Sequence, residues 1–230
     1  MKKVLLSFLF TLAVFSLAAC DSEEDTVDLD VSQGVTEDTI TVGNAAGTSG
    51  QFADVGQPFN SAIRSYFEMV NNDGGIAGRE IEFIHYDDES DAELGLNYIQ
   101  ELVEDDEVFA IVGHLGTPTV EATRDYLTSV GIPRVYYATG VSTLFNPDAE
   151  GGERTSFPVQ PIYDAEGEVM VARIVDEFDA DEIGVIYTDD DAGTGMFDGI
   201  EKRAEELGIT LNAKEAGYSE ADMSSAAREL

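Results

Sequence analysis

Hydrophobic and polar residues alternate with two different periods along the chain, and the two periods predict an α/β fold. Short apolar or alternating runs, typical of strands, occupy residues 39–43, 81–86, 108–112 and 134–137. Apolar residues recur every three or four positions, as in amphipathic helices, over residues 59–70, 96–103 and 120–130. Four strands that alternate with three helices predict a parallel, doubly wound sheet, which we assign to a first lobe at residues 39–147.

A second α/β run follows a polar break at residues 146–153, and we assign residues 148–230 to a crossover and a second lobe. Residues 155–160 are expected to form a crossing strand. Beyond them the pattern predicts helices at 168–178 and 196–207 and strands at 183–187 and 209–213. Ser219-x-x-Asp222 resembles a helix start, and the sequence stops at Leu230 within that pattern. Because two strands cannot close a core of their own, we expect a fragment with an incomplete second lobe.

The stretch Phe109-Ala-Ile-Val-Gly-His-Leu-Gly-Thr-Pro118 joins a buried-type strand to a helix through a glycine loop. Thr117 is a suitable N-cap, and Pro118 suits the first helical position. A helix N-terminus offers free backbone N–H groups and a partial positive charge, which suit an anion such as a carboxylate. Ligands of open parallel sheets bind just past the carboxyl ends of the strands, where this loop would lie. The alternative is a βα connection that binds nothing.

Acidic residues dominate the charge of the chain, with 47 Asp and Glu against 12 Lys and Arg, a formal net charge of −35. Nucleic acid is therefore an improbable partner, because phosphate binding needs clustered basic residues. Such a surface repels itself at low salt, and we hypothesise that the protein works outside the cell in a saline medium. One cysteine and two well-separated histidines, His85 and His114, predict no disulfide framework, no metal site and no cofactor.

The N-terminal residues have the pattern of an export signal. Lys2 and Lys3 precede an apolar run, and small residues lead to the sole cysteine, Cys20. Leu17-Ala-Ala-Cys20 resembles a bacterial lipobox, whose cysteine carries the lipid; an ordinary secretory signal with an incidental cysteine is the alternative. We assign residues 1–19 to a lipoprotein signal peptide and residues 20–38 to an acidic tether. This assignment implies an exported protein, lipid-anchored at the outer face of the cytoplasmic membrane.

Several further segments occur together in a recognisable order: Ser49-Gly50, Asn72-Asp-Gly-Gly-Ile-Ala-Gly78, Tyr86-Asp-Asp88, Val112-Gly-His-Leu115, Gly131-Ile-Pro133 and Ala138-Thr-Gly140. Together they resemble the type I solute-binding proteins of ABC importers, specifically the branched-chain amino acid group. The resemblance covers about a hundred residues and continues more weakly over residues 183–195. It implies two Rossmann-like lobes with parallel sheets, joined by crossing strands, that close on a ligand about a hinge.

The resemblance also implies a set of ligand-binding residues. The hydroxyl and backbone N–H of Thr117, beside Gly116, would hold a carboxylate, and the carbonyl of Ala138 would accept from an ammonium group. Gly140 falls where a hydroxyl residue is expected, so Thr139 or Ser142 would have to substitute. Ala192 replaces an aromatic residue, and the remaining aromatic contacts are expected from Phe52, Tyr137 and Tyr163. A further acidic partner for the ammonium group would lie beyond Leu230.

Other chemistries find less support in the sequence. Gly193-Thr-Gly195 and Gly199 mimic a dinucleotide-binding motif, but Asp189-Asp-Asp191 stands directly before them and would repel pyrophosphate. His114 could be a catalytic base, although no nucleophile motif accompanies it, and a structural histidine bonded to loop backbone is favoured. We expect Tyr86-Asp-Asp-Glu89 to be a solvated loop and Tyr66 and Phe67 to be core residues. An enzyme is therefore not expected.

The leading hypothesis is a lipid-anchored solute-binding protein that captures a small amino acid or related polar solute and delivers it to an ABC permease. A ligand-sensing receptor built on the same two-lobe fold is the alternative. Candidate ligands are an aliphatic amino acid, a small amide or urea, or an aromatic carboxylate.

Overall fold

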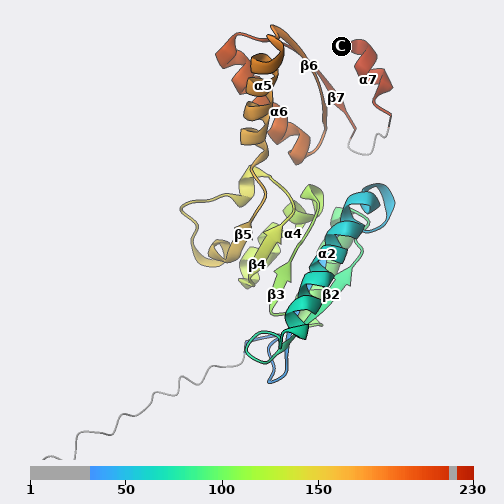
Figure 1. The fold of residues 1–230 in the computed structure, drawn as a ribbon, viewed down its shortest axis with the longest axis vertical. Coiled ribbons are helices and arrows are strands. Elements are labelled where there is room, and N and C mark those ends of the chain that lie inside the picture. The colour runs from blue at the N-terminus through green and yellow to red at the C-terminus, as the bar shows by residue number, and fades with distance from the viewer. Residues whose placement is uncertain (1–31, 218–221) are drawn as a thin grey trace, which may run out of the picture. The chain divides into compact units, whose positions relative to one another are not determined.

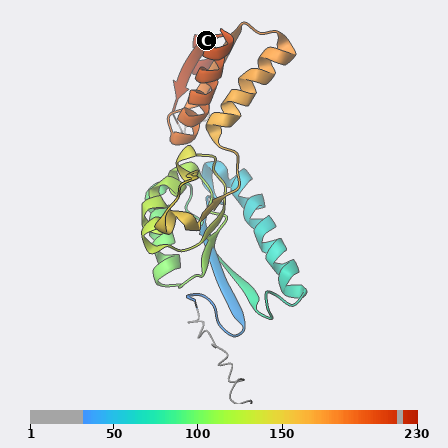
Figure 2. The ribbon, with the colours of Figure 1, turned by 90° about the vertical axis from the view of Figure 1, so that its left-hand side faces the viewer.

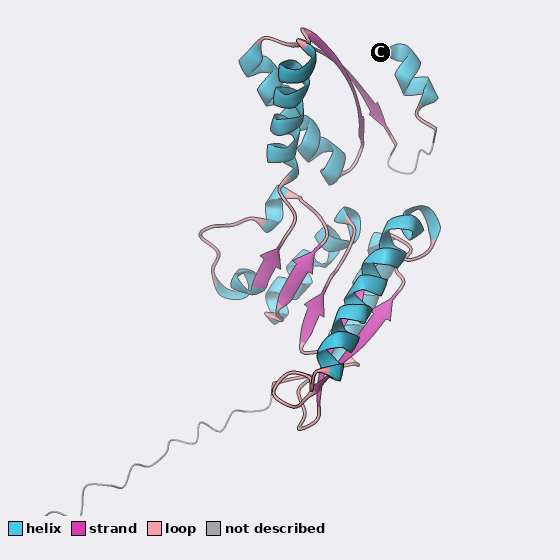
Figure 3. Ribbon diagram, viewed as in Figure 1, coloured by secondary structure: helices cyan, strands magenta, loops and turns pink. Residues whose placement is uncertain are grey.

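A computed structural model describes residues 32–217 and 222–230. The signal peptide, Cys20, most of the acidic tether and Ser219 lie outside the described residues. Within these residues the chain alternates strands and helices, as the hydrophobic periods predict, and it builds two parallel sheets (Figure 3).

The first sheet has five parallel strands in the order β2-β1-β3-β4-β5. They are β1 (Thr39–Ala45), β2 (Glu80–Tyr86), β3 (Ala110–Val112), β4 (Arg134–Tyr137) and β5 (Ser156–Pro158). The first four confirm the predicted strands within a few residues, and β5 confirms the predicted crossing strand. The order places β3 at the middle of the sheet, between β1 and β4, so the loop after β3 lies at the centre of its carboxyl edge.

Helices cover both faces of this sheet. They are α2 (Ala53–Asn72), α3 (Ala92–Glu104) and α4 (Thr117–Val130). Helix α2 lies on one face, and α4, with α3 packed against it, lies on the other (Figures 1 and 2). The core under α3 and α4 contains Ile99, Leu102, Ile111 and Leu127, all fully buried. Burial of such side chains stabilises the lobe by about 1.5–3 kcal/mol for each residue.

Strand β4 contains a bulge that the hydrophobic pattern does not reveal. Tyr136 has a left-handed backbone, with φ of 62°, and the pairing of β4 with β5 shifts register between Val135 and Tyr137. Bulges turn side chains out of the regular alternation. As a result Tyr137 is 1% exposed, whereas Tyr136 is 50% exposed.

Short 3₁₀ turns connect several of these elements. They are η1 (Gly50–Phe52), η2 (Ser142–Leu144) and η3 (Gly151–Thr155). The first turn leads directly into α2, which therefore begins six residues before the predicted helix start at residue 59. The helical period misses this segment because it is polar and contains glycine.

The remaining residues form α5 (Tyr163–Phe178), β6 (Glu182–Thr188), α6 (Asp191–Leu207), β7 (Thr210–Ala216) and α7 (Ser224–Glu229). Strands β6 and β7 pair in parallel and form a two-stranded sheet. Val171, Ile183, Val185, Ile200 and Ala204 form its core. The predicted elements of this region are confirmed, except that α5 begins at Tyr163 rather than at residue 168 and α6 at Asp191 rather than at residue 196.

The early start of α6 explains the glycine-rich motif at residues 193–199, because these glycines lie inside a helix. A Cβ on Gly199 would lie 1.9 Å from the carbonyl oxygen of Asp164, and one on Gly193 would lie 2.2 Å from that of Thr188. Both glycines therefore allow close packing of α6 against α5 and β6. The motif has a structural reason, and no phosphate-binding loop is needed to account for it.

Two predictions about helix starts are wrong by one residue. Gly116, with φ of 103°, is the N-cap of α4, and Thr117 is the first helical residue rather than the cap. The spacing Ser90-x-x-Glu93 is that of a capping box and predicts Ser90 as the N-cap of the next helix. The N-cap of α3 is instead Asp91, since its side chain accepts from the N–H of Leu94 at 2.8 Å. Ser90 instead has φ of 63° and belongs to the preceding turn.

Two predictions about burial are also wrong. Tyr66 was expected in the core, but it is 60% exposed on the outer side of α2, while Phe67 is half-buried against Phe83. Asp88 was expected in a solvated loop, yet it is fully buried. Helices α3 and α4 approach each other closely above Asp88, because a Cβ on Gly95 would lie 2.1 Å from Cγ2 of Thr119.

Candidate functional site

A cavity of about 570 Å³ lies at the carboxyl edge of the first sheet, beside the N-terminus of α4. Six of the eight predicted ligand-binding residues line it: Phe52, Gly116, Thr117, Tyr137, Ala138 and Tyr163. Thr139 and Gly140 do not; they line a neighbouring cavity of about 460 Å³. The structure thus brings the main predicted groups together at one place, although their contact with a ligand stays a prediction.

The N-terminus of α4 supplies the polar end of this cavity. Gly116 adopts a conformation that favours glycine, and its carbonyl accepts from the N–H of Val120 at 2.9 Å. The first N–H groups of a helix have no intrahelical acceptor, and Pro118 has no N–H to satisfy. The helix dipole adds a partial positive charge at this point. The arrangement suits a carboxylate.

Thr117 is 5% exposed, and its hydroxyl lies 2.6 Å from that of Thr139. Oγ1 of Thr139 also accepts weakly from the N–H of Val141 at 3.4 Å. When Thr139 donates to Thr117, the proton of Thr117 is free to point into the cavity. Donation in a chain strengthens each hydrogen bond by polarisation. Thr139 is thus within hydrogen-bond distance of the Thr117 hydroxyl but does not line this cavity.

His114 is a structural residue beneath the cavity, as predicted. It is fully buried, with Nδ1 2.7 Å from the carbonyl oxygen of Ala45 and Nε2 3.0 Å from Oγ1 of Thr123. Burial lowers the pKa of His114 to about 4, so the imidazole is neutral at pH 7. Its bonds link β1, the loop after β3 and α4.

Asp87 holds the loop that carries Phe52. Its Oδ1 accepts from the N–H groups of Thr48 at 2.8 Å, Ser49 at 3.2 Å and Glu89 at 3.1 Å. These hydrogen bonds from backbone and from the Ser49 side chain lower the pKa of Asp87, although its burial acts in the opposite direction. The carboxylate thereby joins the end of β2 to the turn that leads into α2.

Asp88 is buried beside this loop. One carboxylate oxygen accepts from the N–H of Ser90 at 2.9 Å, while Oδ2 has no hydrogen-bond partner among the described residues. Burial raises the pKa of Asp88 to about 6. Sequence reasoning missed this residue, because a run of acidic residues usually indicates a solvated loop.

A buried polar network fixes the inner end of α2. Asn44 donates to Oδ1 of Asn60 at 3.1 Å and to the carbonyl of Gly113 at 2.7 Å, and its own oxygen lies 2.9 Å from Nδ1 of His85. Asn44 and Asn60 are both buried. Buried polar groups that are paired in this way define one arrangement of the surrounding elements. The network therefore fixes the position of Phe59, the neighbour of Asn60.

Phe59 and Tyr136 form the aromatic wall of the cavity that sequence reasoning missed. Their rings stack with centroids 5.7 Å apart and planes 19° apart. Phe59 was expected only as a core residue of a helix, and the bulge in β4 that turns Tyr136 outward has no sequence signal. Tyr137, which was expected to contact the ligand, lies almost wholly beneath the cavity surface.

The second α/β region contributes Tyr163, Asp190 and Ala192 to the lining. Asp190 caps α6, since its Oδ1 accepts from the N–H of Gly193 at 3.0 Å and from Oγ1 of Thr188 at 2.5 Å. Its carboxylate is therefore already engaged within its own loop.

The family to which this fold belongs follows from sequence comparison. A family model described as periplasmic binding protein matches residues 39–230. The chain belongs to the periplasmic binding protein family. Membership implies an exported protein. Curated relatives of this periplasmic binding protein are named as binding proteins.

Two curated relatives come from Pseudomonas aeruginosa. An amino acid binding protein is 26% identical over 171 residues, which make up 74% of this chain and 44% of the relative. A leucine-, isoleucine-, valine-, threonine- and alanine-binding protein is 24% identical over 186 residues, or 78% of this chain and 47% of the relative. This periplasmic binding protein therefore spans about half the length of the curated relatives that it matches.

Solved structures confirm the predicted fold class and the resemblance to type I solute-binding proteins. A fatty acid ABC transporter substrate-binding protein from Thermomonospora curvata gives a TM-score of 0.77 at 26% identity, covering 86% of this chain and 49% of that one. A branched-chain amino acid transporter protein from Streptococcus pneumoniae, in complex with isoleucine, gives a TM-score of 0.71. At 21% identity, with 84% of this chain and 53% of that one covered, the second likeness shows the fold alone.

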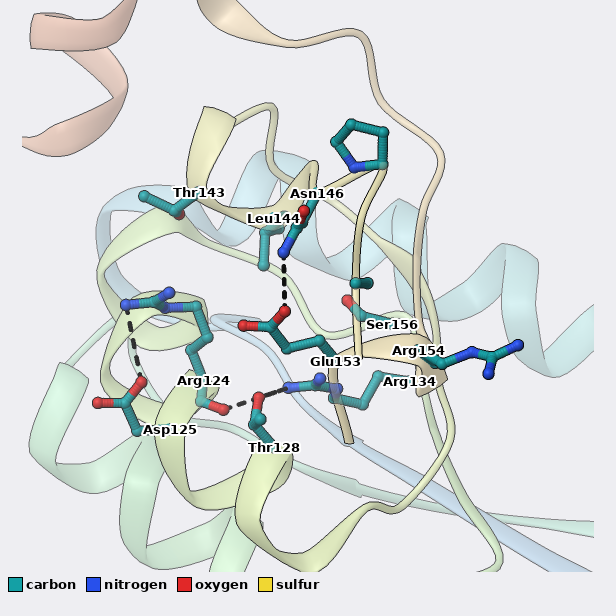
Figure 4. Close-up of a pocket in the computed structure, with 12 residues that line it drawn as sticks. Arg124, Asp125, Thr128, Arg134, Thr143, Leu144, Asn146, Glu153, Arg154 and Ser156 are labelled. Atoms are coloured by element: carbon teal, nitrogen blue, oxygen red, sulfur yellow. Dashed lines mark hydrogen bonds and ion pairs between the residues drawn. The ribbon is translucent and has the colours of Figure 1, made fainter. Parts of the chain in front are cut away.

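A smaller cavity of about 290 Å³ lies at the opposite end of β4 in this periplasmic binding protein (Figure 4). Arg134 forms its floor and is 1% exposed. Its guanidinium donates to the carbonyl of Arg124 at 3.2 Å, to Oγ1 of Thr128 at 3.0 Å and to the carbonyl of Gly152 at 3.1 Å. Arg134 therefore joins α4 to η3, and this cavity has a structural explanation.

The described residues show neither a membrane-spanning helix nor a metal site. No helix in the described part of the chain is both long and apolar enough to cross a membrane. Among the same residues, no three His, Cys, Asp or Glu side chains gather as metal ligands would.

Proposed function

We propose that this periplasmic binding protein captures a small amino acid or a related solute that bears a carboxylate, and that it delivers the solute to an ABC importer. The observation that carries the proposal is the position of Thr117, which lines a cavity at the first turn of α4. The names of the relatives support an amino acid as the solute, and the name of the Thermomonospora curvata protein supports a carboxylate more generally.

The carboxylate would accept hydrogen bonds from the hydroxyl and the N–H of Thr117. Thr139 would orient the hydroxyl by donating to it, over the observed 2.6 Å. Hydrogen bonds to a charged group contribute about 1.5–3 kcal/mol each. A single carboxylate at this helix terminus would therefore supply much of the affinity of a small solute.

Other lining groups have distinct proposed roles. The carbonyl of Ala138 is only weakly engaged, by the N–H of Gly116 at 3.5 Å, and it would accept from a ligand ammonium group. Phe52 and Tyr163 would form apolar walls. Gly140 lines the neighbouring cavity rather than this one, and it allows close approach of the chain, since a Cβ there would lie 2.2 Å from the carbonyl oxygen of Pro161.

We propose that the N-terminal residues anchor the protein to the outer face of the cytoplasmic membrane. Residues 1–19 would be a lipoprotein signal peptide, Cys20 the lipidated residue, and residues 20–38 an acidic tether. Residues 39–147 would form the first lobe, and residues 148–230 the crossover and residues of the second lobe. A lipidated N-terminal cysteine would carry the more than one acyl chain that stable anchoring needs.

Calorimetric titration of the purified protein tests the proposed function. Leucine, isoleucine and alanine are compared with leucinamide, which has the same side chain and ammonium group but no carboxylate. We expect one site for an amino acid and at least tenfold weaker binding of the amide. Equal affinity for leucine and leucinamide, or no binding of any of the three amino acids, would contradict the proposed carboxylate-binding site at Thr117.

A further inference from the structure

Asp88 is a buried carboxyl group that the proposed binding of a solute does not use. It is 0% exposed, and no basic side chain of the described residues forms an ion pair with it. Its Oδ2 has no hydrogen-bond partner among those residues. A buried carboxylate without a basic partner is costly, so its presence calls for a reason. The described residues alone bury it, and the argument therefore does not depend on a bare surface.

Asp88 lies behind the first turn of α4. A Cβ on Gly95 of α3 would lie 3.3 Å from Oδ2 of Asp88 and also 3.3 Å from Cβ of Thr119. Thr119 is fully buried, follows Thr117 by two residues, and has a hydroxyl without a partner among the described residues. The glycine thus lets the carboxyl group of Asp88 approach the helix terminus that lines the cavity.

Ser90 connects Asp88 with the same cavity. The N–H of Ser90 donates to Oδ1 of Asp88 at 2.9 Å, and Ser90 lines the cavity together with Thr117. Glu89 and Ser90 have φ of 52° and 63°, so two successive residues other than glycine adopt a left-handed backbone. Such a backbone stores strain and is frequent at functional sites. Asp88 is therefore linked to the cavity through a lining residue as well as through α4.

The N-terminus of α4 is the point at which two negative charges would meet. Its partial positive charge favours the carboxylate of Asp88 and a solute carboxylate at Thr117 alike. Helix α4 has no acidic residue in its own first turn. Two carboxylates at one helix end repel each other, and the repulsion is strong where water is excluded. Protonation of Asp88 removes this repulsion, and by linkage a bound carboxylate favours protonation of Asp88 to the same extent.

Other ionisable groups occupy the adjoining ends of β2, β3 and α3; they are His85, Asp87, Glu89, Asp91, Glu93 and His114. Burial raises the pKa of Asp88, and the charge of Asp87 raises it further. Burial lowers the pKa of both histidines, so both are neutral at pH 7. The three remaining carboxylates are exposed, and solvent screens their charge. Asp88 is thus the buried acid of this group whose charge a solute carboxylate would affect most.

We propose that the protein takes up a proton at Asp88 when a carboxylate binds at Thr117, so that solute and proton are captured together. The inference rests on the proposed function, since it needs a carboxylate at Thr117. Asp88 is then a positioning residue, which acts through Ser90 and the first turn of α4 and does not touch the solute. A carboxyl group that destabilises the folded chain is retained because it links binding to pH.

Calorimetric titration of the purified protein with leucine tests the proposal, because the carboxyl group of leucine stays ionised between pH 5.5 and 7.5. A tenfold coupling, within the usual range, would raise the pKa of Asp88 by about one unit on binding. We then expect affinity to increase about fivefold from pH 7.5 to pH 5.5. Titration at pH 6.5 in buffers of different ionisation enthalpy counts the protons, and we expect uptake of about half a proton for each leucine bound.

Asp88→Asn keeps an acceptor for the N–H of Ser90 and cannot ionise. It should bind leucine at pH 7.5 about as tightly as the wild type does at pH 5.5, with no dependence on pH and no proton uptake. Asp91→Asn is the matched control, because Asp91 is exposed one residue after Ser90 and asparagine also caps a helix. It should keep both the pH dependence and the proton uptake of the wild type.

The possible outcomes separate this inference from the proposed function. Leucine binding that is independent of pH and takes up no proton in the wild type would overturn the inference and leave the proposed function standing. Proton uptake that persists in Asp88→Asn, or that disappears equally in Asp91→Asn, would also overturn the inference. Absence of binding by leucine, isoleucine and alanine at every pH would overturn the proposed function itself.

Discussion

The hydroxyl oxygens of Thr117 and Thr139 lie 2.6 Å apart, although the two residues follow different strands of the first sheet. Thr117 begins α4 after β3, and Thr139 follows the end of β4. The parallel sheet brings these two chain segments together, because the carboxyl ends of neighbouring strands meet at one edge. The two hydroxyls are hydrogen-bonded to each other, and of the two residues only Thr117 lines the cavity at the N-terminus of α4.

Replacing Thr117 with valine removes the hydroxyl and keeps the shape of the side chain. We expect carboxylate affinity to fall by about 1–3 kcal/mol, the cost of leaving a charged group without its partner. Thr117→Ser keeps the hydroxyl and should bind within a few-fold of the wild type. Calorimetric titration measures both variants. Equal losses in valine and serine would indicate that packing rather than the hydroxyl decides affinity.

Thr139→Val should act on affinity only through Thr117. We expect a loss of about 0.5–1.5 kcal/mol, the net contribution of a typical hydrogen bond, and almost no further loss when Thr117→Val is already present. A double-mutant cycle of the four proteins measures this coupling. Fully additive losses would mean that Thr139 contacts the solute directly.

Because His114 is buried in its neutral form, we expect the free energy of unfolding to decrease in acid. Its folded-state pKa is lowered to about 4, below the ordinary value of 6.5, so the unfolded chain takes up the proton first. The contribution of His114 is complete above pH 6.5 and falls as pH decreases towards 4, by about 3 kcal/mol in total. Urea unfolding at a series of pH values measures the slope. His114→Gln, which cannot ionise, should lose this part of the pH dependence.

For Asp88 we expect the opposite change of stability with pH, over part of the same pH range. Its folded-state pKa is raised from 3.8 to about 6, so its charge destabilises the folded protein above pH 6. The penalty disappears as pH falls through 6 towards 3.8. Asp88→Asn keeps an acceptor for the N–H of Ser90, and we expect it to stabilise the protein by about 1–3 kcal/mol at pH 7.5.

The Asp88 variant should have no advantage at pH 4, where the wild-type carboxyl is protonated as well. Asp87→Asn is the informative comparison, because hydrogen bonds lower the pKa of that neighbouring carboxylate. It should destabilise the protein at pH 7.5. Stabilisation by both asparagine variants would indicate general relief of negative charge rather than relief of burial at Asp88.

The alternation of strands and helices at residues 39–147 is predictable, because the hydrophobic period of each element is visible in its own residues. Val120, Thr123 and Leu127 recur at helical spacing and are buried in α4, and β3 is a short apolar run between turn signals. The loop between them is also predictable locally, because Gly113 and Gly116 interrupt the apolar run and both adopt positive φ. For this reason the strand, the loop, the helix terminus and the position of Thr117 at the cavity follow from sequence.

The parts that sequence reasoning misses depend on contacts between distant segments. Tyr136 turns outward because β4 and β5 pair with a shifted register, and Asp88 is buried because Gly95 lets α3 approach α4. Neither cause lies within the neighbouring residues. The error at Thr117 is smaller: a threonine before an apolar period indicates a cap, but Gly116 has the backbone conformation that the preceding loop requires.

Gly113 packs against Ile63 and against Phe59 of the aromatic wall. It has φ of 76°, and a Cβ there would lie 2.4 Å from Cδ1 of Ile63 and 3.1 Å from Cε1 of Phe59. Gly113→Ala should therefore destabilise the protein by about 2 kcal/mol, through backbone strain and crowding together. Gly131 is the matched control, because it has φ of 72° with no atom within 4 Å of a built Cβ, and its alanine variant should lose only about 1 kcal/mol.

The crowding at Gly113 is separable from the strain, because Ile63→Ala removes the methyl group that the new Cβ would meet. In the double variant we expect the cost of Gly113→Ala to fall towards that of Gly131→Ala, a coupling that urea unfolding detects. If Gly113→Ala displaces Phe59, which lines the cavity with Thr117, it should also change the affinity for leucine, whereas Gly131→Ala should not. Equal costs for the two alanine variants, with or without Ile63, would mean that α2 does not pack against β3 as closely as the structure shows.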